Sequence, residues 1–506
     1  MTTLQWPPVP EPYWRKNLQI PSFQALEEDI STDVTIVGAG ITGITTAYLL
    51  SLEGVKVTLI DAGKILNGTT GHTTAKLTAQ HGIIYDEFIN HFGRDGAEMY
   101  YQANDMGRAF VKNIIQTLRI DCDFAEHDAY IYTNSDQEFK KLEKEAKAYE
   151  KLNIKGKLVE TMPLTLPMKK AIVMEKQAQF HPLKYLLPLV KSIIEKGGQI
   201  FEDTTAVDVE EGANPRVTTR SGHVITSQQV ISCSHYPFYD GNGFYFTRMY
   251  AERSYVVAVK SNQPYPGGMY LSAETPKRSV RSTPIGNDTL LLLGGESHKT
   301  GHGINTMAHY EALATFGKDV LGATDIHYRW SAQDLYTLDK MPFIGRITSG
   351  KQNISIASGY RKWGMTTSTA AAMILNDLII KGSHPYEELF SPSRFKADPS
   401  IKNFIEHNAD VAVQFVTGKV DMTFKEPNDV AIGEGAHVRI NGQKCGAYRD
   451  DDGKLHLVDA TCTHLGCEVE WNEGDKSWDC PCHGSRFSTD GNVLEGPADQ
   501  PLKSVD

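Results

Sequence analysis

Near its C-terminus, this 506-residue chain holds four side chains that could bind a metal, at a spacing that constrains its fold. Cys462-Thr-His464 is followed after fifteen residues by Cys480-Pro-Cys482-His483, which gives the pattern C-x-H, then C-x-x-H. Structural zinc usually takes paired ligands two to four residues apart, so the single residue between Cys462 and His464 is unusual for zinc. A cluster of two irons with histidine in place of cysteine on one iron fits the spacing better. Zinc and plain disulfides remain as alternatives.

The segment around these ligands has the pattern of a small all-β module. Between residues 426 and 506, Gly and Asp turn signals separate short alternating runs such as HVRI and KLHLVDA. Its two ligand-bearing hexapeptides resemble those of the Rieske [2Fe-2S] family. The resemblance implies that Cys462 and Cys480 bind one iron of the cluster, and that His464 and His483 bind the other.

The same resemblance assigns roles to residues beside the ligands. In Rieske proteins of quinol-oxidising cytochrome complexes, a disulfide joins the positions of Cys467 and Cys482, so the pair indicates the high-potential branch of the family. Ser485 matches a hydroxyl donor to a cluster sulfide. Phe487 stands where the family often has Tyr as a second donor, and we therefore expect a potential below the top of the Rieske range of roughly −150 to +300 mV. The segment 496–498 resembles the proline loop that covers the cluster.

A second motif near the N-terminus predicts a dinucleotide site. The apolar run at residues 33–37 is followed by Gly38-Ala-Gly40-Ile-Thr-Gly43 and a helical pattern, and a second strand pattern ends at Asp61. In such a unit the first glycine makes a tight turn, the second admits a pyrophosphate to the backbone, and the third lets the helix pack on the strand. The acid at the end of the second strand is placed to bind a ribose hydroxyl.

Over about residues 30 to 385, several motifs resemble the FAD-dependent D-amino-acid oxidase superfamily, especially the glycine, sarcosine and dimethylglycine oxidoreductases. The resemblance implies that the loop 68–77 crosses the pyrophosphate and reaches the isoalloxazine, although a Thr-rich surface turn is the alternative. It further implies that Val207 reads the adenine through its backbone and that the N-terminus of a helix near residue 364 stabilises negative charge on the ring. The FAD-binding residues expected on this basis are Gly38, Gly40, Ile41, Thr42, Gly43, Asp61, Ala62, Thr69, Thr70, His72, Thr74, Ala75, Lys76, Leu77, Val207, Gly345, Gly364, Met365 and Thr366.

His72 and a few candidate substrate residues stand apart from that set. In dimethylglycine and sarcosine dehydrogenases a loop histidine carries FAD covalently, and His72 has the same offset, but Gly71 replaces the preceding Trp, so both a covalent bond and a noncovalent contact stay open. We expect no obligatory catalytic base, because an amine gives its hydride directly to flavin. Arg281 is the candidate clamp for a substrate carboxylate, with structural salt bridging as the alternative. Candidate pocket walls and a cation beside the ring complete the set: Tyr255, His298, Trp363 and Lys76.

These motifs divide the chain into an α/β FAD-binding domain of Rossmann type with an α+β substrate domain, followed by a small all-β Rieske domain. The FAD-dependent part spans residues 1–385, with FAD-binding segments at about 30–90, 160–235 and 330–385 and substrate segments at about 91–159 and 236–329. Residues 386–425 form a linker, and residues 426–506 form the Rieske domain. In the middle of the chain, periodicity predicts helices over 104–118, 135–152 and 366–380, and strands over 224–233 and 254–259.

Charge and hydropathy exclude several classes of protein. The net charge of −11 argues against a protein whose main task is binding nucleic acid or an anionic membrane, and no apolar run is long enough for a membrane span. We expect a cytoplasmic location, since residues 1–21 carry Trp, Pro and mixed charge rather than a signal sequence.

The combination of two redox centres predicts the activity. Flavin takes electrons in pairs and the cluster passes them singly, so we expect an FAD-dependent dehydrogenase that oxidises a small amine or N-alkyl amino acid and reduces its own cluster. The cluster would then reduce a soluble one-electron carrier such as a ferredoxin or cytochrome. The alternatives are a reductase or monooxygenase component that takes electrons in through the cluster, and a non-enzymatic redox sensor.

Overall fold

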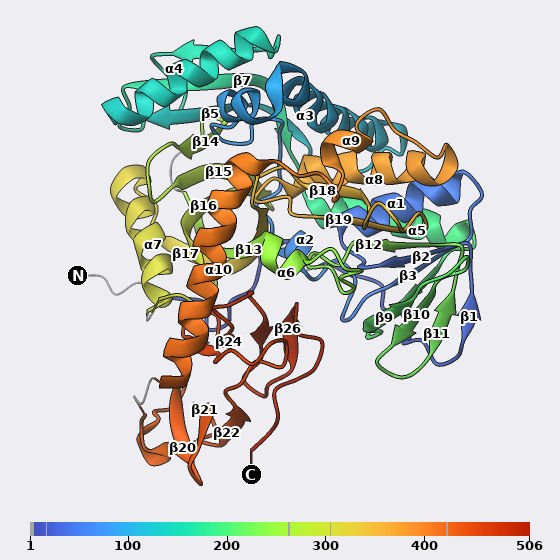
Figure 1. Cartoon of the computed structure of the whole chain (residues 1–506). Helices are drawn as coiled ribbons and strands as arrows, with labels where there is room; N and C mark the ends of the chain where they lie inside the picture. The colour runs from blue at the N-terminus through green and yellow to red at the C-terminus, as the bar shows by residue number, and fades with distance from the viewer. Residues whose placement is uncertain (1–4, 17, 262–263, 304, 421–423, 506) are drawn as a thin grey trace.

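The computed structural model of the chain describes residues 5–16, 18–261, 264–303, 305–420 and 424–505. Within these ranges the chain forms two large sheets with their covering helices and one smaller sheet, and two further small sheets near the C-terminus (Figure 1). The C-terminal sheets lie below the large ones in this view, and the long helix α10 (Ala397–Val420) runs from one part to the other.

The sheet that carries the dinucleotide motif has the order β18-β19-β12-β2-β3-β8 among the described residues. Its strands pair in parallel except at β18, which runs antiparallel to β19. β2 and β3 are buried at every position, as expected for strands of a parallel sheet covered on both faces. The bounds are β2 (Val34–Val37), β3 (Val57–Ile60), β8 (Gln199–Phe201), β12 (Gln229–Ser232), β18 (Phe343–Arg346) and β19 (Ile354–Ser358).

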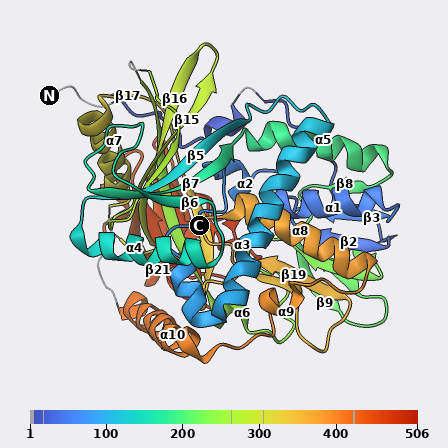
Figure 2. The same ribbon diagram turned by 90° about the horizontal axis from the view of Figure 1, so that it is seen from above.

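Helices cover one face of this sheet and a smaller sheet covers the other. On the helical side, α1 contacts both α5 and α8, and α8 also contacts α3, so these helices form one layer (Figure 2). On the opposite side, the sheet β1-β11-β10-β9 shares an apolar core with β2, β3 and β12. The bounds are α1 (Ile41–Leu52), α3 (Tyr85–Thr117), α5 (Pro182–Glu195), α8 (Gly364–Ile380), β1 (Ile30–Ser31), β9 (Ala206–Glu210), β10 (Arg216–Thr219) and β11 (Val224–Thr226).

The larger mixed sheet has nine strands among the described residues, in the order β17-β13-β16-β15-β14-β5-β7-β4, with β6 paired to β7. Helix α7 packs on β13 and β16, and α4 packs near β6 and β7. β7 and most of β17 lie in segments that the sequence assigned to the FAD-binding part. The bounds are β4 (Lys76–Leu77), β5 (Ala125–Thr133), β6 (Gly156–Val159), β7 (Lys170–Gln179), β13 (Met249–Lys260), β14 (Met269–Ser272), β15 (Arg278–Ile285), β16 (Asp288–Lys299), β17 (Asp325–Thr337), α4 (Asp136–Lys151) and α7 (Met307–Leu321).

The C-terminal part is all-β, as the sequence predicts. It contains the sheets β20-β21-β22 and β23-β24-β25-β26. The expected linker is not an open chain, because it includes α9 and the 24-residue helix α10, whose apolar residues show no clean helical period. The bounds are β20 (Gly435–Ile440), β21 (Gln443–Arg449), β22 (Leu455–Asp459), β23 (Glu470–Asn472), β24 (Ser477–Asp479), β25 (Arg486–Phe487), β26 (Val493–Glu495) and α9 (Glu387–Phe390).

Among the residues described, we find no helix with both the length and the apolar character that crossing a bilayer would need.

Candidate functional site

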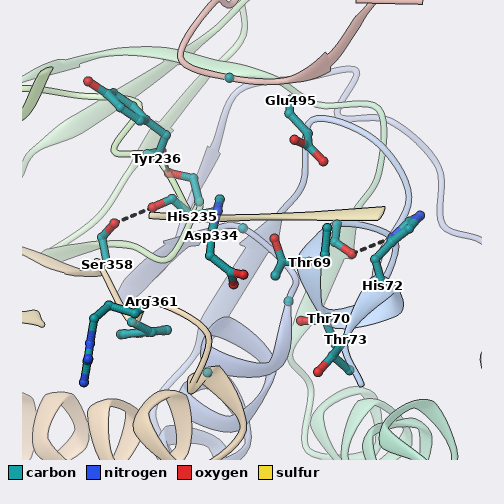
Figure 3. Close-up of a pocket in the computed structure, with 18 of the residues that line it drawn as sticks. Thr69, Thr70, His72, Thr73, His235, Tyr236, Asp334, Ser358, Arg361 and Glu495 are labelled. Atoms are coloured by element: carbon teal, nitrogen blue, oxygen red, sulfur yellow. Dashed lines mark hydrogen bonds between the residues drawn. The ribbon is translucent and has the colours of Figure 1, made fainter. Parts of the chain in front are cut away.

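A cavity of about 1400 Å³ lies between the two large sheets, and the C-terminal part supplies one of its walls. Its lining begins at the dinucleotide loop 37–42, continues along α2 (Thr69–His72), and reaches the first turn of α8. Figure 3 shows Thr69, Thr70 and His72 on one wall, Asp334 near the centre, and Glu495 entering from the C-terminal part. A long cavity with these walls can hold an extended dinucleotide.

Glycines bring the chain close enough at one end of the cavity to bind a pyrophosphate. Gly38 has φ +106°, and a Cβ there would lie 2.5 Å from the carbonyl oxygen of Cys233. A Cβ on Gly43 would lie 1.9 Å from the carbonyl oxygen of Gly38, so only glycine lets α1 approach the β2 loop this closely. The Ile41 N–H donates to Thr70 Oγ1 at 2.9 Å, which ties the N-terminus of α1 to the threonine loop. Free N–H groups at this helix end favour an anion.

Asp61 is fixed at the same end. Its carboxylate accepts hydrogen bonds from the backbone N–H groups of Ala39, at 2.7 Å, and Gly63, at 2.9 Å. Burial raises the pKa of Asp61, and these two hydrogen bonds act in the opposite direction. Each carboxylate oxygen retains a lone pair for a ligand hydroxyl, which fits a ribose.

The threonine loop continues to His72 and Lys76. His72 Nδ1 lies 2.9 Å from the carbonyl oxygen of Asn67 and 3.0 Å from that of Gly68, so Nδ1 carries the proton and Nε2 remains for a cofactor. Burial lowers the pKa of His72. Burial, and then the charge of Arg281, lower the pKa of Lys76 to about 7.

The wall at the start of α8 is held by polar contacts that the sequence did not reveal. His81 stacks on Trp363 with ring centroids 5.0 Å apart and an interplanar angle of 15°. His81 Nε2 donates to the carbonyl oxygen of Thr78 at 2.8 Å, while Nδ1 accepts from the Tyr100 hydroxyl at 2.5 Å. Arg361 donates to the same hydroxyl at 3.1 Å. These residues come from separate elements, and no local motif predicts that they meet.

Most of the predicted FAD residues line this one cavity. Five do not: Gly43, Ala75, Leu77 and Thr366 are buried without lining it, and Gly345 borders a separate small depression near Arg346. The residues that do line it are Gly38, Gly40, Ile41, Thr42, Asp61, Ala62, Thr69, Thr70, His72, Thr74, Lys76, Val207, Gly364 and Met365.

The predicted substrate residues divide in the same way. Tyr255, Trp363 and Lys76 line the cavity, whereas Arg281 and His298 do not. His298 packs behind the wall, where its Nε2 lies 2.9 Å from the Tyr255 hydroxyl. Arg281 is only 2% exposed, and its Nε and Nη1 have no hydrogen-bond partner among the described residues. Burial lowers the pKa of Arg281 to about 9. An unpaired buried guanidinium next to Lys76 suits an anion.

Sequence reasoning missed Asp334, which points into the centre of the cavity (Figure 3). It lies on β17 opposite Glu252 of β13. Burial raises the pKa of Asp334 to about 7. A lone acid on a strand carries no spacing signal, so only the fold identifies it.

The four predicted metal ligands converge in the C-terminal part. The Cys462 and Cys480 thiols lie close enough to interact, and the rings of His464 and His483 lie 5.0 Å apart at 88°. The Cys480 thiol, ahead of backbone N–H groups and the Ser485 hydroxyl, lowers the pKa of Cys462 to about 7. His483 Nδ1 is buried and has no partner among the described residues. Two facing thiols, two facing imidazoles and an unpaired buried nitrogen fit a [2Fe-2S] cluster with two histidine ligands.

A disulfide joins the two ligand loops, as the resemblance implies. Cys467 and Cys482 are bonded, and each belongs to one of the hexapeptides that carry the ligands.

The cluster site and the large cavity share a wall. His464 lines the cavity, and so do residues 492–499, which include the proline loop. Tyr236 of the cavity wall lies edge-on to His464 at 6.4 Å, and Phe246 lies edge-on to His483 at 6.1 Å. Both histidine ligands therefore face the cavity side of the C-terminal part.

Comparisons with known proteins agree with this arrangement. The family model described as FAD dependent oxidoreductase matches residues 33–378, and the Rieske [2Fe-2S] domain model matches residues 422–506. The iron-sulfur protein YhfW of Bacillus subtilis (strain 168), named as a Rieske 2Fe-2S protein, is 51% identical over 498 residues, which are 98% of each chain. The gamma-glutamylputrescine oxidoreductase of Escherichia coli (strain K12) is 22% identical over 383 residues, which are 71% of this chain and 85% of that one.

Solved structures support the fold of the larger part. Glycine oxidase from Geobacillus kaustophilus superimposes with a TM-score of 0.62 at 16% identity, covering 72% of this chain and 99% of that one. The two resemblances drawn from the sequence are thus confirmed, and with them the cofactors FAD and a [2Fe-2S] cluster.

Proposed function

We propose that this chain, which belongs to the FAD-dependent oxidoreductase family and carries a C-terminal Rieske [2Fe-2S] domain, is a dehydrogenase for a small amine or N-alkyl amino acid. Its electrons leave singly through the cluster to a soluble one-electron carrier such as a ferredoxin or cytochrome. When bound, FAD supplies a hydride acceptor and the cluster supplies a one-electron relay. The observation that carries the proposal is that His464, a cluster ligand, lines the same cavity as the FAD-binding loop.

The charges around the cavity support a substrate that bears a carboxylate. Lys76 lines the cavity, and Arg281 lies close enough to lower the Lys76 pKa. Since two buried nitrogens of Arg281 have no hydrogen-bond partner among the described residues, a carboxylate near Lys76 gives this cationic pair a counter-charge. The same positive charge disfavours a protonated amine nearby and so favours the neutral form, which is the form that can lose hydride.

Asp334 can accept the amine proton. Its carboxyl points into the cavity, and burial raises its pKa to about 7, which suits a group that exchanges protons near neutral pH. In the overall reaction the substrate loses two electrons and two protons, one from carbon and one from nitrogen, to give an imine. Two molecules of the one-electron carrier are reduced.

Two further observations support electron flow outward through the cluster. The disulfide between Cys467 and Cys482 marks the high-potential branch in the resemblance drawn above, and a high-potential cluster is a good acceptor from reduced flavin. The Escherichia coli relative is named as an oxidoreductase of gamma-glutamylputrescine, which is an amine.

An anaerobic redox titration tests the direction of flow. We expect the cluster, followed by electron paramagnetic resonance, to have a higher potential than the flavin, followed by visible absorbance. A panel of amines and N-methyl amino acids should then reduce both centres without added reductant. A cluster potential well below that of the flavin would support the reductase alternative instead. A correct order of potentials with no reduction by any amine would favour the redox sensor.

A further inference from the structure

Five charged side chains meet in the interface between the FAD-dependent part and the Rieske domain. We call them the interdomain charge cluster: Arg253, Asp475, Asp479, Arg486 and Glu495. Arg253, on β13, is the member from the FAD-dependent part and is completely buried. Its Nη2 donates to Glu495 at 2.9 Å, its Nη1 lies 3.6 Å from Asp475, and its Nε lies 3.7 Å from Asp479. One guanidinium thus contacts three carboxylates of the other domain.

Arg486 contacts the same three carboxylates from within the Rieske domain. It lies 3.0 Å from Asp479, 3.2 Å from Asp475 and 3.3 Å from Glu495. Two arginines therefore face three carboxylates, of which Asp475 and Asp479 are buried and Glu495 is a quarter exposed, and Arg253 contacts them only while the domains are docked. If Arg253 were withdrawn, three carboxylates would share one arginine, and leaving buried charges without their partner is strongly unfavourable.

Further contacts between the two domains surround the interdomain charge cluster, and they are equally close. The Tyr310 hydroxyl donates to Asp475 at 2.8 Å, and Gln333 Nε2 donates to the carbonyl oxygen of Gly484 at 2.9 Å. A Cβ on Gly484 would lie 2.5 Å from Ala251 Cβ, and a Cβ on Gly301 would lie 2.5 Å from Pro481 Cα. The two surfaces leave no room for a side chain at these points, as in a protein interior.

These contacts hold the part of the Rieske domain that surrounds the cluster. Pro481 and Gly484 flank the ligand His483 in the second ligand loop. Glu495 ends β26, immediately before the proline loop that lines the large cavity. The same interdomain contacts therefore fix both the ligand loop and the wall that the proline loop contributes to the flavin cavity.

We propose that Arg253 is a positioning residue that keeps the Rieske domain docked throughout turnover, so that electrons pass between the flavin cavity and the cluster without movement of the domain. The histidine side of the cluster then stays turned toward the flavin, and an external carrier must approach another face of the Rieske domain. The inference needs both cofactors but not the proposed amine substrate.

The test follows electron transfer inside the intact holoprotein after a light pulse that reduces the flavin, with EDTA as the sacrificial electron donor in place of any substrate. Cluster reduction is monitored by visible absorbance and confirmed by electron paramagnetic resonance in frozen samples. In the wild-type protein we expect the rate to be unchanged when glycerol raises the viscosity severalfold, because no domain has to diffuse. In Arg253→Met we expect a rate at least tenfold lower that falls further with viscosity.

Matched variants separate positioning from loss of folding. Arg439→Met removes an exposed arginine of the Rieske domain and should behave as wild type. Glu495→Gln keeps the shape of the side chain and removes one charge, so it should show a smaller decrease of the same kind even if Arg253→Met loses cofactor. Calorimetry of the wild type should show one unfolding transition, and the transition of Arg253→Met should split into two.

Two results would overturn the proposal. One is a wild-type rate that decreases with viscosity, which would mean that the domain moves. The other is an unchanged rate in both Arg253→Met and Glu495→Gln. Because light replaces the substrate, a failure to find an amine that reduces the flavin leaves this test intact.

Discussion

At the residue scale, Ser485 shows how one hydroxyl can set the electronic properties of the cluster. Ser485 is completely buried, its Oγ accepts the Ala498 N–H at 2.9 Å, and its hydroxyl contributes to the lowered pKa of the Cys462 thiol. The proline loop thereby fixes the direction of the O–H bond. A donor to cluster sulfur stabilises the more negative, reduced state and raises the potential.

Replacing Ser485 with Ala should lower the potential of the cluster. The lost hydrogen bond to a charged group is worth about 1.5 kcal/mol, which corresponds to about 60 mV for one electron. Phe487→Tyr should change the potential in the opposite direction, because it restores the donor that the family often has. The measurement is a redox titration of the reduced cluster signal by electron paramagnetic resonance.

Ser488→Ala is the control for this comparison, since Ser488 bonds to Asn492 in the turn before β26 rather than to a ligand. Its potential should match that of the wild type. An equal decrease in Ser485→Ala and Ser488→Ala would mean that the potential follows the general polarity of the domain and not this hydrogen bond.

At the element scale, local sequence patterns predicted those parts of the site that lie within a single motif. The unit from β2 through α1 to β3 could be predicted because its tight turn and its close helix packing each require glycine. Gly38 and Gly43 occupy these two positions. The helix α10 was not predicted, because its apolar residues follow no clear period and its packing on the Rieske domain decides its structure. Arg253 and Asp334 were missed because their roles arise from strands that meet only after folding.

Two ligand loops that are separate in sequence act as one element because of the disulfide between Cys467 and Cys482. Its closed loop of about 15 residues should stabilise the domain by roughly 3 kcal/mol. The double variant Cys467→Ala and Cys482→Ala should therefore lose cluster absorbance at a lower guanidinium concentration than the wild type, while the flavin transition moves less.

Cys445→Ala is the matched control, because Cys445 is a buried cysteine of the same domain that takes part in no disulfide. It should leave the midpoint of cluster loss nearly unchanged. Equal midpoints for the double variant and the wild type would show that the loops are held together by the cluster alone.

At the scale of the whole molecule, the two cofactor sites share one cavity. Rieske residues 492–499 form one wall of the flavin cavity, and the interdomain charge cluster links this wall to β13. The cavity therefore has walls from both domains.

The intact protein should accept three electrons, two at the flavin and one at the cluster. Anaerobic titration with dithionite, monitored by flavin absorbance and by electron paramagnetic resonance of the cluster, should end after three electrons per chain. His464→Ala removes a predicted cluster ligand and leaves the FAD-binding loops unchanged. The variant should therefore keep its flavin and accept only two electrons. If that variant lost flavin and cluster together, the two sites would depend on each other for assembly as well as for electron transfer. If the wild type stopped at two electrons, the cluster would lie too low in potential to serve as the outlet.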